Sequence, residues 1–350
     1  MIRTGGAVYS VEFTVGGRLE VRINSSDVGK RVSVRSVVEP GHDGAKFTDT
    51  VGILTSWNDG VLLITRRTGD SVRIEETALV AGKPVPTAPA RRRGPSATFP
   101  ELARAQAGAW QPLESEGLGD WVLRASEGFT RRANSVLVAG EPGVPLDQAL
   151  ERVVDWYGRR GLPAYIQTST GADSTHEVLS ARLEERGWRR EVSANVMVGP
   201  LAPLADAEDA ARLDGVAMAR QPDTHWLGRY NRASSAGAVS PGVLRVLGSG
   251  ASTWFATVPG ESPEASATAI GRCVVDGRWA GFAAVEVAAA RRREGLASLV
   301  MAALARQALD EGASASWLQV ESDNTGALAL YDRLGFAVHH RYHHYRYMGS

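Results

Sequence analysis

The stretch VEVAAARRREGLA, residues 285–297, joins an apolar strand to a helix through a short loop. The first amides of a helix have no partner inside it and carry partial positive charge, so they attract anions. Gly295 and Ala297 lack bulk, which lets an anion come close to these amides, and Arg292 or Arg293 would add charge-assisted hydrogen bonds. The stretch therefore indicates a seat for a pyrophosphate. Taken alone, the pattern also fits a turn whose small residues serve only packing.

A second stretch, LQVESDNTGALALYDRLGF, residues 318–336, follows about 30 residues later. It predicts a strand over 315–320 and a helix over 325–335. Steps of four and three residues place Ala327, Tyr331 and Leu334 on one face of this helix, so we expect the Tyr331 hydroxyl to point inward. A buried tyrosine usually needs a hydrogen-bond partner. Core packing is the alternative explanation for Tyr331.

Together the two stretches resemble the GCN5-related N-acetyltransferase (GNAT) superfamily, and the resemblance covers residues 205–350 well and 100–200 weakly. It implies acetyl-CoA as cosubstrate, with its pyrophosphate on the loop 292–297 and its pantetheine between two parallel strands, 278–287 and 315–320. Backbone N–H groups near Val285 and Val287 would hold the pantetheine and polarise the thioester carbonyl. The expected cofactor-binding residues are Val285, Val287, Arg292, Arg293, Gly295, Leu296, Ala297 and Asn324.

The resemblance also assigns catalytic roles. Tyr331 matches the acid that protonates the departing thiolate. Many members of the superfamily carry a glutamate, as general base, at the position of Gln319 or on the fourth strand. Because glutamine cannot take a proton, Glu286 and Glu321 remain as candidates, directly or through water. Glu286 interrupts an apolar strand, where burial of a carboxylate is costly unless the group is partnered or functional. A solvated edge position would explain it equally well.

The rest of the chain predicts three further parts. Residues 1–80 show short β-rich runs (17–23, 30–38, 50–57, 60–67 and 71–74), typical of a small all-β barrel. Residues 81–100 hold five prolines and predict a stiff linker. Such a barrel, SH3-like, ahead of a GNAT region resembles a group of actinobacterial acetyltransferases, some of which are regarded as N-acetylglutamate synthases. We therefore expect a mixed α/β GNAT fold at 205–350 behind a degenerate GNAT-like lobe at 101–204.

A faint internal repeat supports the degenerate lobe. Residues 159–188 can be laid over 310–336, which places Leu183 opposite Tyr331. The first copy lacks the R-x-x-G-x-A loop and has no tyrosine at this position. We therefore expect it not to bind acetyl-CoA in the usual way, and to serve as scaffold or as a wall of the substrate site.

Composition excludes several classes of protein. Lys+Arg and Asp+Glu both total 39, so nothing favours a nucleic-acid binder, and a single cysteine, Cys273, excludes a disulfide framework. We see no secretory signal and no apolar run long enough for a membrane span, and expect a cytoplasmic protein. Four histidines fall at 339, 340, 343 and 344, but with no cysteine or carboxylate beside them we expect no metal site. A polar strand lining the acceptor pocket fits them better.

The function expected from these observations is acetyl-CoA-dependent transfer of an acetyl group to a primary amine. An α-amino group, with a pKa near 8, is far more often neutral at pH 7 than a lysine near 10.4, which favours an amino acid such as glutamate as acceptor. Two alternatives stay open: a weakly catalytic protein that senses acyl-CoA, and a protein N-acetyltransferase whose barrel recruits its target. A homodimer is compatible with the sequence, which names no partner for the barrel.

Overall fold

The computed structural model describes residues 20–41, 44–86, 94–230, 239–262 and 264–349. The chain divides into two compact units, residues 1–89 and 90–350, and each is considered by itself. Among the described residues, no helix is long and apolar enough to cross a lipid bilayer.

The N-terminal unit is a five-stranded antiparallel sheet in the order β4-β3-β2-β1-β5. The strands are β1 (Arg31–Gly41), β2 (Gly44–Asn58), β3 (Val61–Thr65), β4 (Ser71–Glu75) and β5 (Leu79–Pro84), and a single 3₁₀ turn, η2 (Glu76–Ala78), joins the last two. Alternating apolar side chains fill one core: Ile23, Val32, Val34, Leu54, Leu62, Ile64 and Ile74. The unit fits the predicted small β domain.

Two details of the N-terminal prediction are wrong. Of the run 17–23, the described residues 20–23 contribute one isolated bridge between Val21 and Gly82 and no strand; Val21 is exposed. The fifth strand is β5, which continues beyond residue 80 into the predicted linker. A side chain at Gly82 would meet Ile23 at 2.7 Å, so the glycine lets β5 lie against the core. Residues 87–93 of the linker lie outside the described residues.

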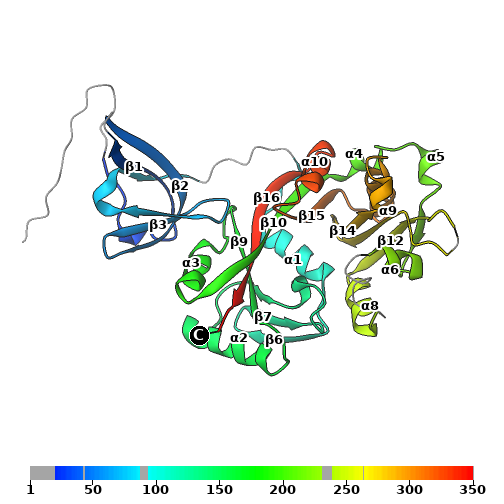
Figure 1. Ribbon diagram of the computed structural model, residues 1–350, viewed down its shortest axis with the longest axis horizontal. Helices are drawn as coiled ribbons and strands as arrows, with labels where there is room; N and C mark the ends of the chain where they lie inside the picture. The colour runs from blue at the N-terminus through cyan, green and yellow to red at the C-terminus, as the bar shows by residue number, and fades with distance from the viewer. Residues whose placement is uncertain (1–19, 42–43, 87–93, 231–238, 263, 350) are drawn as a thin grey trace, which may run out of the picture. The chain divides into compact units, whose positions relative to one another are not determined.

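The C-terminal unit is built on one eleven-stranded mixed sheet in the order β11-β12-β13-β14-β15-β10-β16-β9-β8-β7-β6 (Figure 1). The strands are β6 (Glu114–Leu118), β7 (Trp121–Ala125), β8 (Val136–Val138), β9 (Tyr165–Thr170), β10 (Trp188–Pro200), β11 (Ala217–Ala219), β12 (Ser252–Val258), β13 (Ala269–Asp276), β14 (Trp279–Val287), β15 (Ala315–Glu321) and β16 (Ala337–Tyr347). The neighbours β8 and β9, and β14 and β15, are parallel, and the other described pairs in this sheet are antiparallel.

The helices of this unit cover both faces of the sheet. They are α1 (Phe99–Ala109), α2 (Leu146–Gly158), α3 (Glu177–Glu185), α4 (Leu201–Ala205), α5 (Ala210–Leu213), α6 (Thr224–Arg229), α8 (Pro241–Leu247), α9 (Leu296–Asp310) and α10 (Thr325–Arg333), with 3₁₀ turns η3 (Arg131–Ala133) and η4 (Ala289–Arg291). The mixed α/β fold predicted from the sequence is confirmed.

The same order of elements occurs twice along the chain. The first lobe runs β8-α2-β9-α3-β10 and the second β14-α9-β15-α10-β16, and in each the two strands that flank the first helix are parallel. Leu183 lies on α3 and Tyr331 on α10, the corresponding helices. This arrangement is what the internal repeat predicts.

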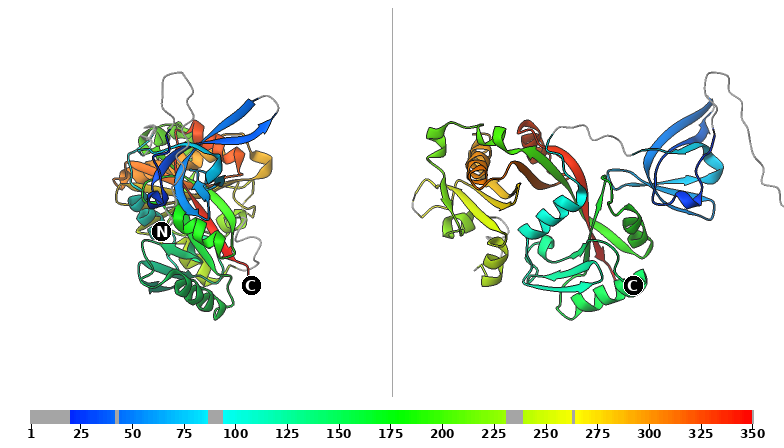
Figure 2. Two further views of the ribbon diagram at one scale, coloured as in Figure 1. Left: turned by 90° about the vertical axis from the view of Figure 1, so that its left-hand side faces the viewer. Right: turned by 180° about the vertical axis from the view of Figure 1, so that it is seen from behind.

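The two lobes exchange their last strands. β10, which ends the first lobe, pairs with β15 of the second, whereas β16, which ends the second lobe, pairs with β9 of the first. The exchanged strands also pair with each other, and they run side by side through the middle of the unit (Figures 1 and 2). The expected boundary at 204/205 therefore follows the order of the chain but does not divide the sheet.

Two apolar clusters lie on opposite faces of the second lobe. One, the α9-side cluster, combines α9 with Phe282, Leu318 and Phe336. The other, the α1-side cluster, combines α1 with Ile270, Trp317 and residues of α6 and α8. The sequence prediction missed α1 because its start falls in the predicted linker. The capping signal was present: Thr98 accepts the backbone N–H of Glu101 at 3.3 Å.

Candidate active site

A gap opens where β14 and β15 part. The two strands pair from Trp279 opposite Ala315 as far as Phe282 opposite Leu318, and no further. Immediately beyond, β14 carries a bulge, because Arg272 of β13 faces Ala283 while Ile270 faces Glu286. Ala284 in this bulge has a positive φ of 52°. A bulge bends the strand that contains it, which turns the end of β14 away from β15.

The end of β14 turns backbone amides toward this gap, beyond its last described pair with β15. Ala288 donates its N–H to Thr268 in the segment that leads into β13, at 2.8 Å. Since successive backbone groups of a strand point to alternate edges, the N–H groups of Val285 and Val287 point the other way, toward the β15 side. These are the two positions where the sequence predicts contacts to the pantetheine.

The turn between β14 and α9 ends in an open helix terminus. Arg293 and Gly295 both have positive φ, 68° and 79°, and Gly295 is the N-cap residue of α9. No side chain caps this helix among the described residues. Leu296 buries its side chain in the α9-side cluster, so only its backbone amide is open to a ligand. The amides of the first turn of α9 are thus available to an anion.

Several arginines surround this turn. Arg292 and Arg293 are exposed and form no ion pair with any described residue, whereas Arg291 is paired with Glu294 at 2.8 Å. Arg212 of α5 donates to the Glu294 carbonyl at 3.4 Å, and its guanidinium would lie 3.6 Å from a Cβ at Gly295. The sequence prediction missed Arg212, because it lies 82 residues before Glu294 and belongs to no local motif.

Tyr331 lies on the α9 side of the sheet. Its ring packs against Phe336 in a T-shaped contact with centroids 6.0 Å apart, and no described residue hydrogen-bonds the hydroxyl. Burial raises the pKa of Tyr331 to about 12, so the hydroxyl stays protonated at neutral pH and can donate. Val285, Val287, Ala327 and Leu328 are half-buried on the same cluster, which gives this side of the gap an apolar lining.

Asn324 has a structural role in the fold. Its side-chain oxygen accepts the backbone N–H of Ala327 at 3.1 Å and so caps α10. An N-cap asparagine at this position is explained by helix geometry alone. A contact between Asn324 and a cofactor remains a prediction.

The two candidate bases lie on the face of the sheet opposite Tyr331. Glu286 faces Ile270 across β13 and β14, and Ile270 belongs to the α1-side cluster, so the half-buried Glu286 points to that face. Glu321 alternates with Trp317 and Gln319 along β15 and shares their face, where it is exposed. Gln319 is hydrogen-bonded at both ends of its amide: its oxygen accepts from Arg132, and its nitrogen donates to Gln106 at 2.7 Å.

A pocket of about 440 Å³, counting the space open to solvent, lies on this α1-side face. It begins at Gln319, one residue past the last β14–β15 pair, and extends over strands of the first lobe. Its polar lining is Gln106, Arg124, Arg132, Gln167, Ser169, His176, Gln319 and His340, and its apolar lining comes mostly from α1. Figure 1 shows α1 lying near the middle of the sheet. Of the predicted polar strand β16, His340 reaches the pocket.

Burial keeps the pocket histidines neutral. Desolvation lowers the pKa of His176 to about 4, and it also lowers the pKa values of His340 and of the neighbouring buried His344 well below the usual range. The unprotonated Nδ1 of His176 accepts the backbone N–H of Ser169 at 3.1 Å. These side chains therefore add no positive charge at pH 7.

The protein is expected to lose stability in mild acid. A histidine whose folded pKa lies below its unfolded value stabilises the fold fully above pH 6.5, and this contribution is lost as pH falls toward 4. For His176 alone the shift corresponds to roughly 3 kcal/mol at its upper bound. Thermal unfolding between pH 7 and 4.5 tests this, with His176→Asn as comparison, since asparagine still accepts the Ser169 N–H but does not titrate. Equal pH slopes for the two proteins would contradict the assignment.

Comparison with known proteins agrees with this geometry. Residues 97–348 match the family described as "Probable histone acetyltransferase Rv0428c C-terminal". The protein named "Probable histone acetyltransferase Rv0428c" of Mycobacterium tuberculosis is 27% identical over 92% of this chain and 95% of its own length. "Uncharacterized N-acetyltransferase YobR" of Bacillus subtilis is 25% identical over 70% of this chain and 97% of its own length. A GCN5-related N-acetyltransferase from Kribbella flavida shares the fold, with a TM-score of 0.52 and 19% identity over 73% of this chain and 98% of that one.

The fold and these relatives define an N-acetyltransferase of the GNAT superfamily. Within that class, the chain belongs to the family of the Rv0428c C-terminal region, because the match covers well over half of its length. Enzymes of the superfamily generally use acetyl-CoA as acetyl donor.

Proposed function

We propose that this protein transfers the acetyl group of acetyl-CoA to a primary amine, with the thioester held in the gap between β14 and β15. The observation that carries this proposal is the turn at Gly295, whose uncapped amides and surrounding arginines lie at the end of the same strand that opens the gap. A diphosphate fits such a turn, because helix amides and guanidinium groups both bind phosphate oxygens. The half-buried apolar residues beside Tyr331 would contact the pantetheine.

In the proposed reaction the general base and the general acid act from opposite faces of the sheet. The amine attacks the thioester carbonyl from the α1 side, and Glu286 or Glu321 takes its proton, directly or through water. The N–H of Val285 or Val287 stabilises the oxyanion that forms on the carbonyl oxygen. Collapse of this intermediate breaks the carbon–sulfur bond, and Tyr331, on the α9 side, protonates the leaving thiolate. The products are the acetylated amine and free CoA.

A free α-amino group is our first candidate acceptor, with glutamate as one example. At neutral pH such an amine is neutral far more often than a lysine side chain, so the enzyme needs less base catalysis to use it. This argument fits a site whose usual glutamate position is occupied by a glutamine that is already hydrogen-bonded on both sides.

A second candidate acceptor is a protein lysine, because the M. tuberculosis relative is named a probable histone acetyltransferase. The N-terminal β domain would then recruit the protein target.

Release of free CoA thiol from acetyl-CoA by the full chain tests the proposal against a panel of amino acids, polyamines, aminoglycosides and a histone-tail peptide. We expect release with at least one free amine. Binding of acetyl-CoA without thiol release for any amine would contradict the proposal and favour a protein that senses acyl-CoA.

Replacing Tyr331 with phenylalanine is expected to lower kcat by about 100-fold, because the thiolate then leaves without a positioned acid. The KM for acetyl-CoA should stay within about twofold, since the ring and its contact with Phe336 are retained. Steady-state kinetics check this, with Tyr347→Phe as control: Tyr347 is also half-buried but packs against Trp188 in the first lobe. If the KM for acetyl-CoA rose in Tyr331→Phe by as much as kcat fell, the result would show that Tyr331 only packs.

A further inference from the structure

The floor of the α1-side pocket is shared by both lobes. Because directly paired residues of neighbouring strands point to the same face, Gln319, Val196 and His340 form one row across β15, β10 and β16. His344 and Gln167 form a second row across β16 and β9. The exchange of β10 and β16 thus builds one continuous surface from the gap at Gln319 to Arg124 on β7.

This surface carries uncompensated positive charge. Arg124 is 4% exposed, and its guanidinium donates to the Ser135 carbonyl and hydroxyl and to Gln167, all of them neutral acceptors. Burial lowers its pKa to about 10, which leaves it charged at neutral pH. Arg132 donates to Gln319, and neither arginine forms an ion pair with a described carboxylate. The neighbouring Arg131, by contrast, is paired with Glu191.

Buried polar atoms at the same place lack partners. Gln106 is 7% exposed and lines the pocket, but its Nε2 has no hydrogen-bond partner among the described residues. His344 does not line the pocket but lies opposite Gln167, which does; it is 2% exposed, and neither ring nitrogen has a partner in the described part of the chain. Buried polar groups are nearly always hydrogen-bonded, and a buried charge is costly unless it is paired. A polar, anionic occupant would accept a hydrogen bond from Gln106 and would pair with the arginines of the pocket.

We propose that this pocket binds a carboxylate of the acceptor, so that the substrate is a small primary amine that also carries a carboxylate. The inference rests on the proposed function and extends it to a class of acceptor. Planar guanidinium groups match a carboxylate with paired hydrogen bonds. Arg132 contacts Gln319, so a carboxylate held at Arg132 leaves the amine of the same molecule facing the gap. The first lobe then acts as the acceptor-binding wall.

The same charges disfavour a lysine-rich acceptor. A basic peptide in this pocket would bring further ammonium groups toward Arg124 and Arg132, and like charges in an interface are repulsive. The pocket therefore distinguishes the two candidate acceptors by the sign of the charge that it prefers.

The test compares amino acids with their carboxamides, which keep the amine but lose one carboxylate: the only one in glycinamide, and the α- or the γ-carboxylate in the two monoamides of glutamate. We use glycine with glycinamide, and L-glutamate with its α-carboxamide and with L-glutamine, and compare kcat/KM per unprotonated amine. The wild-type full chain should prefer a free carboxylate by at least about 100-fold, because a site built for a hydrogen-bonded group rejects an analogue that lacks it. In Arg132→Gln this preference should fall below about tenfold through a higher acceptor KM, while the KM for acetyl-CoA is unchanged.

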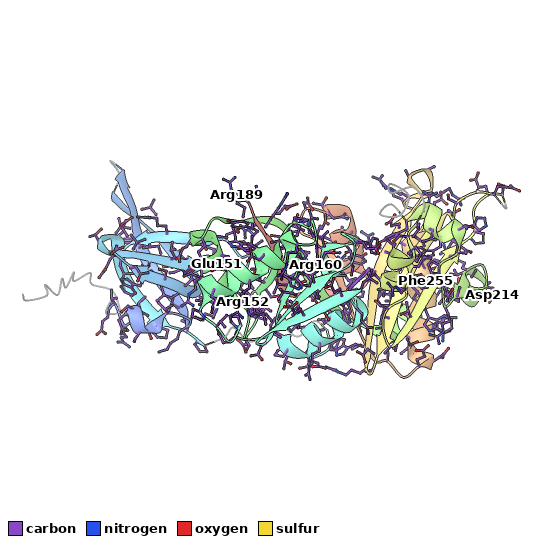
Figure 3. The ribbon with its side chains drawn as sticks, turned by 90° about the horizontal axis from the view of Figure 1, so that it is seen from below. Glu151, Arg152, Arg160, Arg189, Asp214 and Phe255 are labelled. Atoms are coloured by element: carbon purple, nitrogen blue, oxygen red, sulfur yellow. The ribbon has the colours of Figure 1, made fainter. Side chains whose placement is uncertain are left out.

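Two further variants sharpen the test. Arg132→Lys keeps the charge and should restore part of the preference. Arg152→Gln, an exposed arginine on α2 of the same lobe (Figure 3), should behave as wild type. Arg124 is left intact, because its hydrogen bonds tie Ser135 to Gln167 within the sheet.

Calorimetric titration of the same compounds, without acetyl-CoA, separates this inference from the proposed function. Carboxylate binding that Arg132→Gln abolishes supports the pocket even if no amine yields free thiol. Acetyl transfer at equal kcat/KM to glycine and glycinamide, and to L-glutamate and both of its monoamides, overturns the pocket and leaves the transferase intact. Equal loss on both compounds in Arg132→Gln also overturns it.

Discussion

Gly295→Glu is expected to raise the dissociation constant for acetyl-CoA by more than about 100-fold, equivalent to roughly 2.7 kcal/mol, and to abolish transfer. A glutamate there would place a carboxylate within reach of Arg212, whose guanidinium lies 3.6 Å from the position of the new Cβ. It would compete with the diphosphate for that arginine, which already pairs with Glu208, and repel the diphosphate from the first amides of α9. Titration of acetyl-CoA by calorimetry measures the effect.

A glutamate at a left-handed glycine also strains the backbone, so the control must carry the same strain. Gly312, just past the C-terminus of α9, has a φ of 88° and open space around its Cβ. Gly312→Glu should cost similar stability, of the order of 1 kcal/mol, and leave acetyl-CoA affinity unchanged. Gly295→Asn, which tolerates positive φ without adding charge, should bind better than Gly295→Glu. If both Gly295 variants bind as wild type, the turn does not seat the diphosphate.

A chain that ends after the first lobe, residues 94–206, is expected not to fold alone. Without the second lobe, β9 loses its neighbour β16, β10 loses both β15 and β16, and the first lobe's core loses Tyr345, which β16 contributes. Open edges of this length promote aggregation. Circular dichroism and size-exclusion chromatography should show an unfolded or aggregated fragment, whereas residues 94–350 should be folded.

The exchange of β10 and β16 between the lobes also predicts how two separate fragments behave together. Fragments 94–206 and 207–350, produced together, should associate, because β10 and β16 lie in each other's lobe. A monomeric, folded 94–206 fragment with a cooperative thermal transition would contradict this picture of the fold.

Much of the second lobe could be predicted from the sequence because its signals are local. The run 252–258 is β12, the run 279–287 is β14, and α9 lies within the predicted helix 295–311, since apolar periodicity and the Val275-Asp276-Gly277 turn act over neighbouring residues. Gly295 could be predicted for the same reason, because a small residue directly before a helix is a local sequence signal.

The features that could not be predicted depend on contacts between distant parts of the chain. Arg212 approaches the turn at Gly295 from α5, and the pocket brings Arg124 of β7 together with Gln319 of β15 and His340 of β16, which are far from it in sequence. The strand exchange could not be predicted from the sequences of β10 and β16, because the alternation of side chains along a strand does not depend on which strand it pairs with. The run 17–23 shows the converse: it alternates like a strand, but its described residues form only one bridge.

Because β16 lies near the end of the chain, the sheet of the first lobe can be completed only late in synthesis. Strands β9 and β10 are synthesised well before residues 337–347, yet the space between them is filled only by β16. During translation, the edges of β9 and β10 that pair with β16 therefore stay without this partner until residues 337–347 have been synthesised. Nascent chains of this protein should depend on chaperone protection late in synthesis.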